Sequence, residues 1–203
     1  MFFEIFSKKR ITAMFDTIRI SVDNLDAGFV ERLREHYPSS SLEIKVVKQQ
    51  ETERLSEEQF WELVSLLDWS KTGDDTLVIE PVVQQLAARP MRQVYEFQDM
   101  LSEKLHRLDT KAHAQHVGEN AWQGEDQPFS ADEFLYARCC VVANGKAAYG
   151  AAVKDPSQMP HDLSFEPFLR IARKAYFNKT GKPFRYVPAF NMETFANKEG
   201  WKD

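Results

Sequence analysis

Residues 130–156 read SADEFLYARCCVVANGKAAYGAAVKDP and carry the most informative pattern of the chain. Phe134, Arg138, Val141 and Val142 are spaced i, i+4, i+7 and i+8, which predicts one apolar face of an α-helix with an arginine inside it. An unpaired buried charge is costly, so the guanidinium must either reach water or bind a carboxylate. The pattern therefore predicts a helix whose arginine has a specific polar environment.

The helical signal continues on both sides of this stretch. Apolar residues recur at intervals of three and four in four further segments, 56–67, 76–88, 90–108 and 165–177. The tail that follows residue 183 is rich in aromatic residues, which predicts that it packs on the helices. Residues 55–203 are therefore predicted to form a mainly α-helical domain.

The first 50 residues show a different pattern. Segments 16–22 and 41–47 alternate apolar and polar residues, as half-buried β-strands do. Between them, residues 25–37 repeat an apolar side chain every four positions, which predicts a helix. Residues 1–50 are thus predicted to form a small strand–helix–strand unit, with residues 1–13 as a further strand or a leader. Placed before the helical domain, this unit makes the predicted fold class α+β.

Composition limits the classes of function. The chain has 203 residues, a formal net charge of −5 and a pI of about 5.6, which gives no electrostatic support for nucleic-acid binding. No apolar run approaches the roughly 18 residues of a membrane span, so no membrane contact is predicted. Cys139 and Cys140 are adjacent on the predicted helix, where an ordinary disulfide is geometrically poor. Reduced thiols of this kind favour a cytoplasmic location.

The loop before the arginine helix supplies candidate partners for its charge. Glu125 or Asp126 is placed to form a bidentate ion pair with Arg138, which would fix the loop against the helix. Two alternatives are an arginine that binds a ligand and an arginine that takes part in catalysis. The candidate binding residues are therefore Arg138, Tyr136, Glu125 and Asp126, and no catalytic residue is assigned.

The spacing of ligand-type residues predicts neither a cofactor nor a metal. GKAAYG lacks the spacing of a phosphate-binding loop and follows a helix instead of a strand. His106, Asp109, His113 and His116 would lie along one helical face, but residues seven apart are separated by about 10 Å along the axis. Neighbouring pairs supply only two ligands, whereas zinc takes three or four protein ligands. His113 and His116 are candidate ligands only if other residues complete the site.

Several of these residues also form a pattern that resembles a known family. The residues that carry the resemblance are Phe60, Trp61, Phe134, Tyr136, Arg138, Gly145, Tyr149 and Pro156. Together they resemble the bacterial family catalogued as domain of unknown function number 4240, over about residues 55–180. Cys140 departs from the pattern, since the family often has a tryptophan there. The resemblance implies a helical domain and assigns no activity.

Without a recognisable nucleophile, cofactor motif or complete ligand set, the sequence favours a non-catalytic role. The predicted function is a cytosolic protein-interaction or regulatory module, including a toxin-neutralising partner, because an acidic face complements a basic protein. The alternative is an enzyme or small-molecule-binding domain that uses Arg138 to hold an anion. A protein partner is predicted in the first case, and the N-terminal strands offer a route to a dimer.

Overall fold

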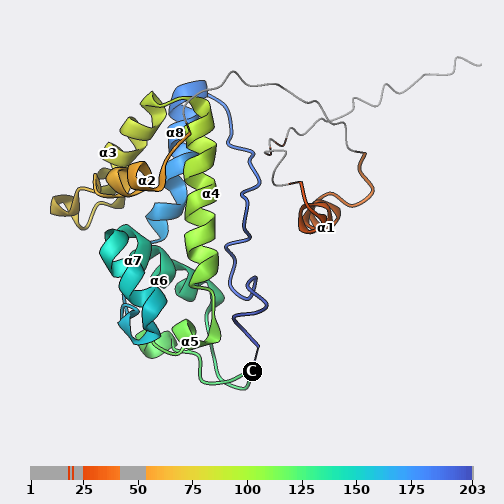
Figure 1. The fold of residues 1–203 in the computed structure, drawn as a ribbon, viewed down its shortest axis with the longest axis vertical. Coiled ribbons are helices and arrows are strands. Elements are labelled where there is room, and N and C mark those ends of the chain that lie inside the picture. The colour runs from red at the N-terminus through yellow and green to blue at the C-terminus, as the bar shows by residue number, and fades with distance from the viewer. Residues whose placement is uncertain (1–17, 19, 21–24, 42–53, 203) are drawn as a thin grey trace, which may run out of the picture.

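The computed structural model describes residues 18, 20, 25–41 and 54–202 (Figure 1). Helices dominate this part of the chain, and the short 3₁₀-helices are labelled η. The elements are α1 (Ala27–His36), α2 (Glu57–Val64), η2 (Trp69–Lys71), α3 (Asp75–Ala88), α4 (Met91–Arg107), α5 (Lys111–Ala114), η3 (Gly118–Asn120), α6 (Ala131–Ala143), α7 (Gly145–Lys154), η4 (Pro156–Gln158), η5 (Glu166–Arg170) and α8 (Ile171–Thr180).

The predicted α+β fold class is wrong. The described residues contain helices and no β-strand, and Ile18 and Ile20 belong to neither a helix nor a strand. The other residues predicted as strands, apart from Ser41, lie outside the described part of the chain, as do residues 1–13. Alternation of apolar and polar residues leads to a strand only where a neighbouring strand pairs with it, and the described helices offer no sheet edge. The helix predicted between the two strands is present as α1.

The long helix α4 organises the helical body. Figure 1 shows α4 along the length of the body, with α2, α3 and α8 beside its upper half and α6 and α7 beside its lower half. Side chains from five helices meet in one apolar core and are fully buried there. They include Phe60 of α2, Val82 of α3, Phe97 of α4, Phe134 of α6 and Ile171 of α8.

The predicted arginine helix is confirmed as α6. Its first turn is capped by Ser130, whose Oγ accepts a hydrogen bond from Glu133 N at 3.2 Å. The helix ends at Ala143, and Gly145 has a φ of 92°, a conformation that favours glycine. The chain can therefore turn sharply there and begin α7 at once. Arg138 lies fully buried in the middle of α6.

The C-terminal segment, residues 183–202, is called the strap here. It contains no helix and runs along α4 as the blue coil of Figure 1. Tyr186 and Phe184 of the strap stack on Tyr95 of α4, with ring centroids 4.7 Å and 6.0 Å apart. Aromatic rings of the strap thus pack on α4. None of the described helices is both long enough and apolar enough to cross a membrane.

Candidate functional site

A row of polar side chains on α4 holds the strap by its main chain. Asp99 accepts hydrogen bonds from Ala189 N at 2.8 Å and from the Tyr186 hydroxyl at 2.7 Å. Three residues further along α4, Ser102 Oγ accepts a hydrogen bond from Phe190 N at 3.3 Å. Because residues three apart share a helical face, these acceptors meet consecutive residues of the extended strap.

His106 continues this row at the next turn of α4. Its Nδ1 lies 2.8 Å from the main-chain oxygen of Asn191, an atom that can only accept, so this nitrogen carries the proton. The imidazole ring also packs against Phe190, with ring centroids 5.5 Å apart. Helix α4 ends at Arg107, so Asp109, His113 and His116 do not share one helix with His106, and this histidine binds the strap.

Asp109, just after the end of α4, is the most heavily bonded carboxylate of the row. It is fully buried, and its Oδ1 accepts hydrogen bonds from Phe195 N at 3.1 Å and Trp201 Nε1 at 2.8 Å. Its Oδ2 accepts a hydrogen bond from Asn197 N at 2.9 Å. Through these three accepted hydrogen bonds, Asp109 fixes the last third of the strap.

Arg138 of α6 also binds the strap. Its Nη1 donates to the main-chain oxygens of Leu105 at 2.8 Å and Met192 at 3.1 Å. Its Nη2 donates to Thr194 Oγ1 at 2.9 Å, and the guanidinium lies over the Phe134 ring, 4.7 Å from the centroid. Burial lowers the pKa of Arg138, since it disfavours the charged form. An external anion would have to displace Met192 and Thr194 to reach this group.

The structure does not bring Arg138 together with the acidic residues predicted beside it. Glu125 and Asp126 are exposed on the loop before α6. The carboxylates whose charges act on Arg138 and oppose the effect of burial on its pKa are instead Asp109 and, more weakly, Glu193. Tyr136 is half-buried, and its main-chain oxygen accepts a hydrogen bond from Phe165 N at 3.0 Å.

His113 joins two helices inside the fold. Its Nδ1 lies 2.7 Å from Thr110 Oγ1, and its Nε2 lies 3.0 Å from the main-chain oxygen of Ala152 in α7. Burial lowers the pKa of His113 and so favours the neutral ring. His116 is half-buried nearby. In the part of the chain that the structure describes, no three His, Cys, Asp or Glu side chains are grouped so that they could hold a metal ion.

Sequence reasoning missed a buried lysine on α4. Lys104 is only 5% exposed, and its Nζ lies 2.8 Å from Glu57 Oε1. The same ammonium lies over the rings of Phe60, Trp61 and Tyr149, at 5.3, 5.2 and 5.5 Å from their centroids. Burial raises the pKa of Tyr149 to about 12. The available signal was the position of Lys104 between Leu101 and Leu105 on an apolar helix face.

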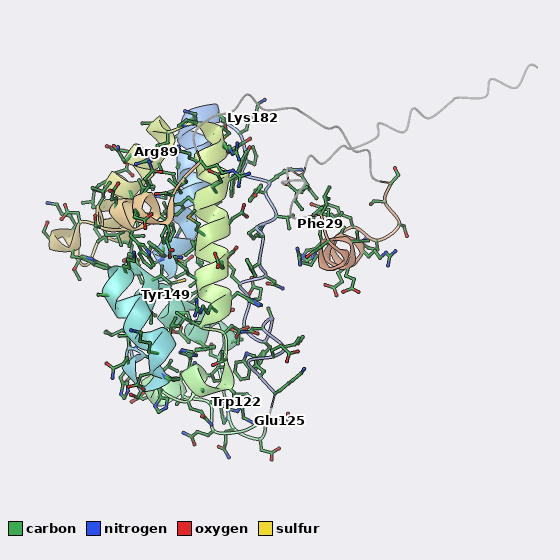
Figure 2. The ribbon with its side chains drawn as sticks, viewed as in Figure 1. Phe29, Arg89, Trp122, Glu125, Tyr149 and Lys182 are labelled. Atoms are coloured by element: carbon green, nitrogen blue, oxygen red, sulfur yellow. The ribbon has the colours of Figure 1, made fainter. Side chains whose placement is uncertain are left out.

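An open cleft lies where the strap meets the loop before α6, at the lower end of the body in Figure 2. It has a volume of about 640 Å³. We call it the acidic cleft after the adjoining acidic loop, residues 118–133. Its lining residues are Lys111, Gln115, Trp122, Gln123, Gly124, Glu125, Phe195 and Trp201.

Aromatic rings form one wall of the acidic cleft, and its charged lining residues are Glu125 and Lys111. The Trp201 ring centroid lies 5.4 Å from that of Trp122 and 4.4 Å from that of Phe195. Residues 118–133, which include Glu125, contain five Asp or Glu residues and no Lys or Arg. The aromatic faces and the Glu125 carboxylate attract positive charge, whereas Lys111 repels it.

Part of the sequence, including some residues of this site, matches the model of a known protein family. The family model described as "Protein of unknown function (DUF4240)" matches residues 55–178, from just before α2 into α8. The match includes Arg138 and the polar row of α4, and it ends before the strap. No curated protein and no solved structure matches the chain. Since the model covers more than half of the sequence, the chain belongs to this family of unknown function.

Proposed function

We propose that the protein is a non-catalytic protein-interaction module that binds a basic segment of a partner protein at the acidic cleft. The observation that carries this proposal is the combination of an aromatic wall with Glu125 in one open cleft. Tryptophan and other aromatic residues are enriched at protein interfaces, and arginine binds well to their faces. The neighbouring acidic loop would speed the approach of a positively charged partner.

The buried polar groups support a binding role over a catalytic one. Arg138, Asp109 and His113, which carry the chemistry most often used in catalysis, make their hydrogen bonds within the protein. Cys139 and Cys140 are buried, and burial raises the pKa of both thiols, which disfavours the nucleophilic thiolate. The open cleft instead offers aromatic rings, amides, the Glu125 carboxylate and the Lys111 ammonium to a protein surface.

Titration calorimetry with a tetra-arginine peptide tests this proposal directly. The full chain should bind the peptide, and Glu125→Lys should weaken binding by about tenfold, because an attractive charge in the cleft becomes a repulsive one. The matched control is Glu62→Lys, which makes the same charge change at an exposed position of α2. Equal weakening by both variants, or no binding by the full chain, would contradict a specific site at the cleft.

A second pair of variants tests the shape of the cleft independently of charge. Gln123→Trp should block the cleft, since Gln123 lines it, and should weaken peptide binding. Gln127→Trp places the same bulk on the same loop at an exposed position outside the lining and should leave binding unchanged. Similar affinities for the two variants would place the peptide elsewhere on the protein.

A further inference from the structure

We infer that the basic partner of the acidic cleft is a second copy of this chain, which presents the opposite end of its helical body. This inference rests on the proposed function and names the occupant of the same site. It follows from the distribution of charge along the molecule, from a second open hollow and from an exposed aromatic side chain.

The opposite end of the body presents several cations. Arg173, Lys179 and Lys182 are exposed there. A second hollow of about 620 Å³ opens in this region and is lined by Glu80, Arg173, Lys174, Phe177, Asn178, Pro183 and Phe184. We call this surface, together with the neighbouring exposed Lys179 and Lys182, the basic end.

The basic end and the acidic cleft lie at opposite ends of one molecule. Figure 2 shows Arg89 and Lys182 near the upper end of the helical body, and Trp122 and Glu125 near the lower end. A single copy therefore cannot bring its own two charged surfaces together. Two copies can do so when the basic end of one enters the acidic cleft of the other.

The two surfaces also match in their apolar parts. Phe177 is 57% exposed and stands beside the cations of the basic end, next to Phe184 in the same lining. The acidic cleft offers the rings of Trp122, Phe195 and Trp201 to such a side chain. Contact would remove apolar surface from water and pair cations with carboxylates at its rim, as in the core and rim of a protein interface.

This contact joins different surfaces of the two copies, so it is heterologous. Each added copy keeps one unused cleft or one unused basic end, and the association therefore leads to chains or to a closed ring. The opposing charges are exposed, so salt should weaken the contact strongly. The association should depend on both protein concentration and ionic strength.

Sedimentation velocity of the full chain tests the inference, with each protein measured over a range of concentrations. At an ionic strength of about 0.01 M, where the Debye length is roughly 30 Å, the mean mass should increase with concentration. At about 1 M, where that length is roughly 3 Å, the protein should be monomeric. A chain that is monomeric at every concentration in low salt would overturn the inference.

Charge-reversal variants identify the surfaces that meet. The double variant Glu125→Lys, Asp126→Lys reverses the charge beside the cleft. The double variant Arg173→Glu, Lys182→Glu reverses the charge of the basic end. Each double variant alone should be monomeric. An equal mixture of the two should associate, because the second variant keeps its acidic cleft and the first keeps its basic end. Association of either double variant alone, or a mixture that stays monomeric, would overturn the inference.

A control and a comparison separate this inference from the proposed function. The control double variant Glu58→Lys, Glu62→Lys changes the net charge by the same amount as the cleft variant, but on α2. It should leave self-association intact. If the full chain binds tetra-arginine at the cleft but does not self-associate, the proposed function stands and the second copy is not the partner. If the chain self-associates while Gln123→Trp has no effect on peptide binding, the proposed peptide site fails by itself.

Discussion

Arg138 is the residue whose replacement should affect stability most directly. Arg138→Met keeps the apolar stem but removes the donors that satisfy Leu105, Met192 and Thr194. A buried acceptor left without its donor costs about 1–3 kcal/mol, so the free energy of unfolding should fall by about 3 kcal/mol in all. Urea unfolding followed by far-UV circular dichroism measures this change.

Arg170→Met is the matched control for this prediction. The Arg170 side chain is 32% exposed and pairs with Glu166 one turn before it. Ion pairs of this kind contribute at most about 1 kcal/mol, so the urea midpoint should move little. Equal shifts for Arg138→Met and Arg170→Met would show that the buried hydrogen bonds of Arg138 do not hold the strap.

The sequence predicts that Arg138 is buried, but not what it binds. Helical periodicity places this arginine on the apolar face of α6, and it lies there. Its main acceptors, however, are main-chain oxygens of Leu105 and Met192, and any residue type has such an oxygen. Glu125 and Asp126 were reasonable partners by charge and proximity in sequence. Contacts to the backbone of a distant segment leave no such pattern of residue types.

The ion pair of Glu57 with Lys104 predicts a dependence of stability on pH. A hydrogen bond from Lys104, and its positive charge, lower the pKa of Glu57 in the folded protein. The unfolded chain therefore binds a proton at higher pH than the folded one. The stabilisation is present above the ordinary glutamate pKa of about 4.3 and is lost as the pH falls through the lower pKa of the folded state.

Glu57→Gln should remove this pH dependence. In urea unfolding, the stability difference between the wild type and Glu57→Gln should be largest near neutral pH and shrink on acidification below about pH 4. The neighbouring exposed Glu58 provides the control, since Glu58→Gln removes a charge from the same helical turn. A difference between wild type and Glu57→Gln that stays constant with pH would contradict the role of this pair.

At the scale of an element, the strap should detach locally when Asp109 is changed. Asp109→Asn keeps the size of the side chain but replaces an oxygen that accepts from Phe195 and Trp201, or from Asn197, with an NH₂ donor. A donor then faces a donor inside the protein, which is unfavourable. Amide hydrogen exchange should increase in residues 190–202, while α3 and α8 keep their protection.

Asp126→Asn makes the same chemical change in the exposed loop and should leave the exchange of the strap unaltered. Fluorescence gives a second readout, because Trp201, which binds Asp109 in the wild type, becomes more exposed to water when the strap detaches. Unchanged exchange in residues 190–202 of Asp109→Asn would mean that other contacts suffice to hold the strap.

Helices whose apolar residues repeat with a period of about 3.6 could be predicted from the sequence, and irregular elements could not. Segments 76–88 and 90–108 match α3 and α4 closely, because a single apolar stripe marks each of them. The predicted helix 165–177 is divided into η5 and α8, and Pro167 lies at the start of η5. The strap has no period, so its aromatic content indicated packing but not its path along α4.

At the scale of the whole molecule, the position of the acidic cleft could not be predicted. Its wall combines Trp122 from the loop before α6 with Phe195 and Trp201 from the strap, which are far apart in sequence. Asp109 brings the strap residues to that place. Glu125 was predicted as a binding residue because it is acidic and near Arg138 in sequence. In the structure it lines this cleft, and the hydrogen bonds of Arg138 go to other residues.

The helical body should keep its stability without the first 53 residues. The apolar core that joins α2, α3, α4, α6 and α8 is formed by described residues from Leu55 onward, and the family match also begins at residue 55. A chain that begins at residue 54 should therefore have a melting temperature within about 4 °C of that of the full chain, equivalent to roughly 1 kcal/mol. Differential scanning calorimetry measures both chains.

The control is a chain that ends at residue 182, which loses the strap and its bonds to Asp99, Asp109 and Arg138, and should melt much lower. A large loss of stability in the chain that begins at residue 54 would show that the N-terminal residues belong to the same folding unit.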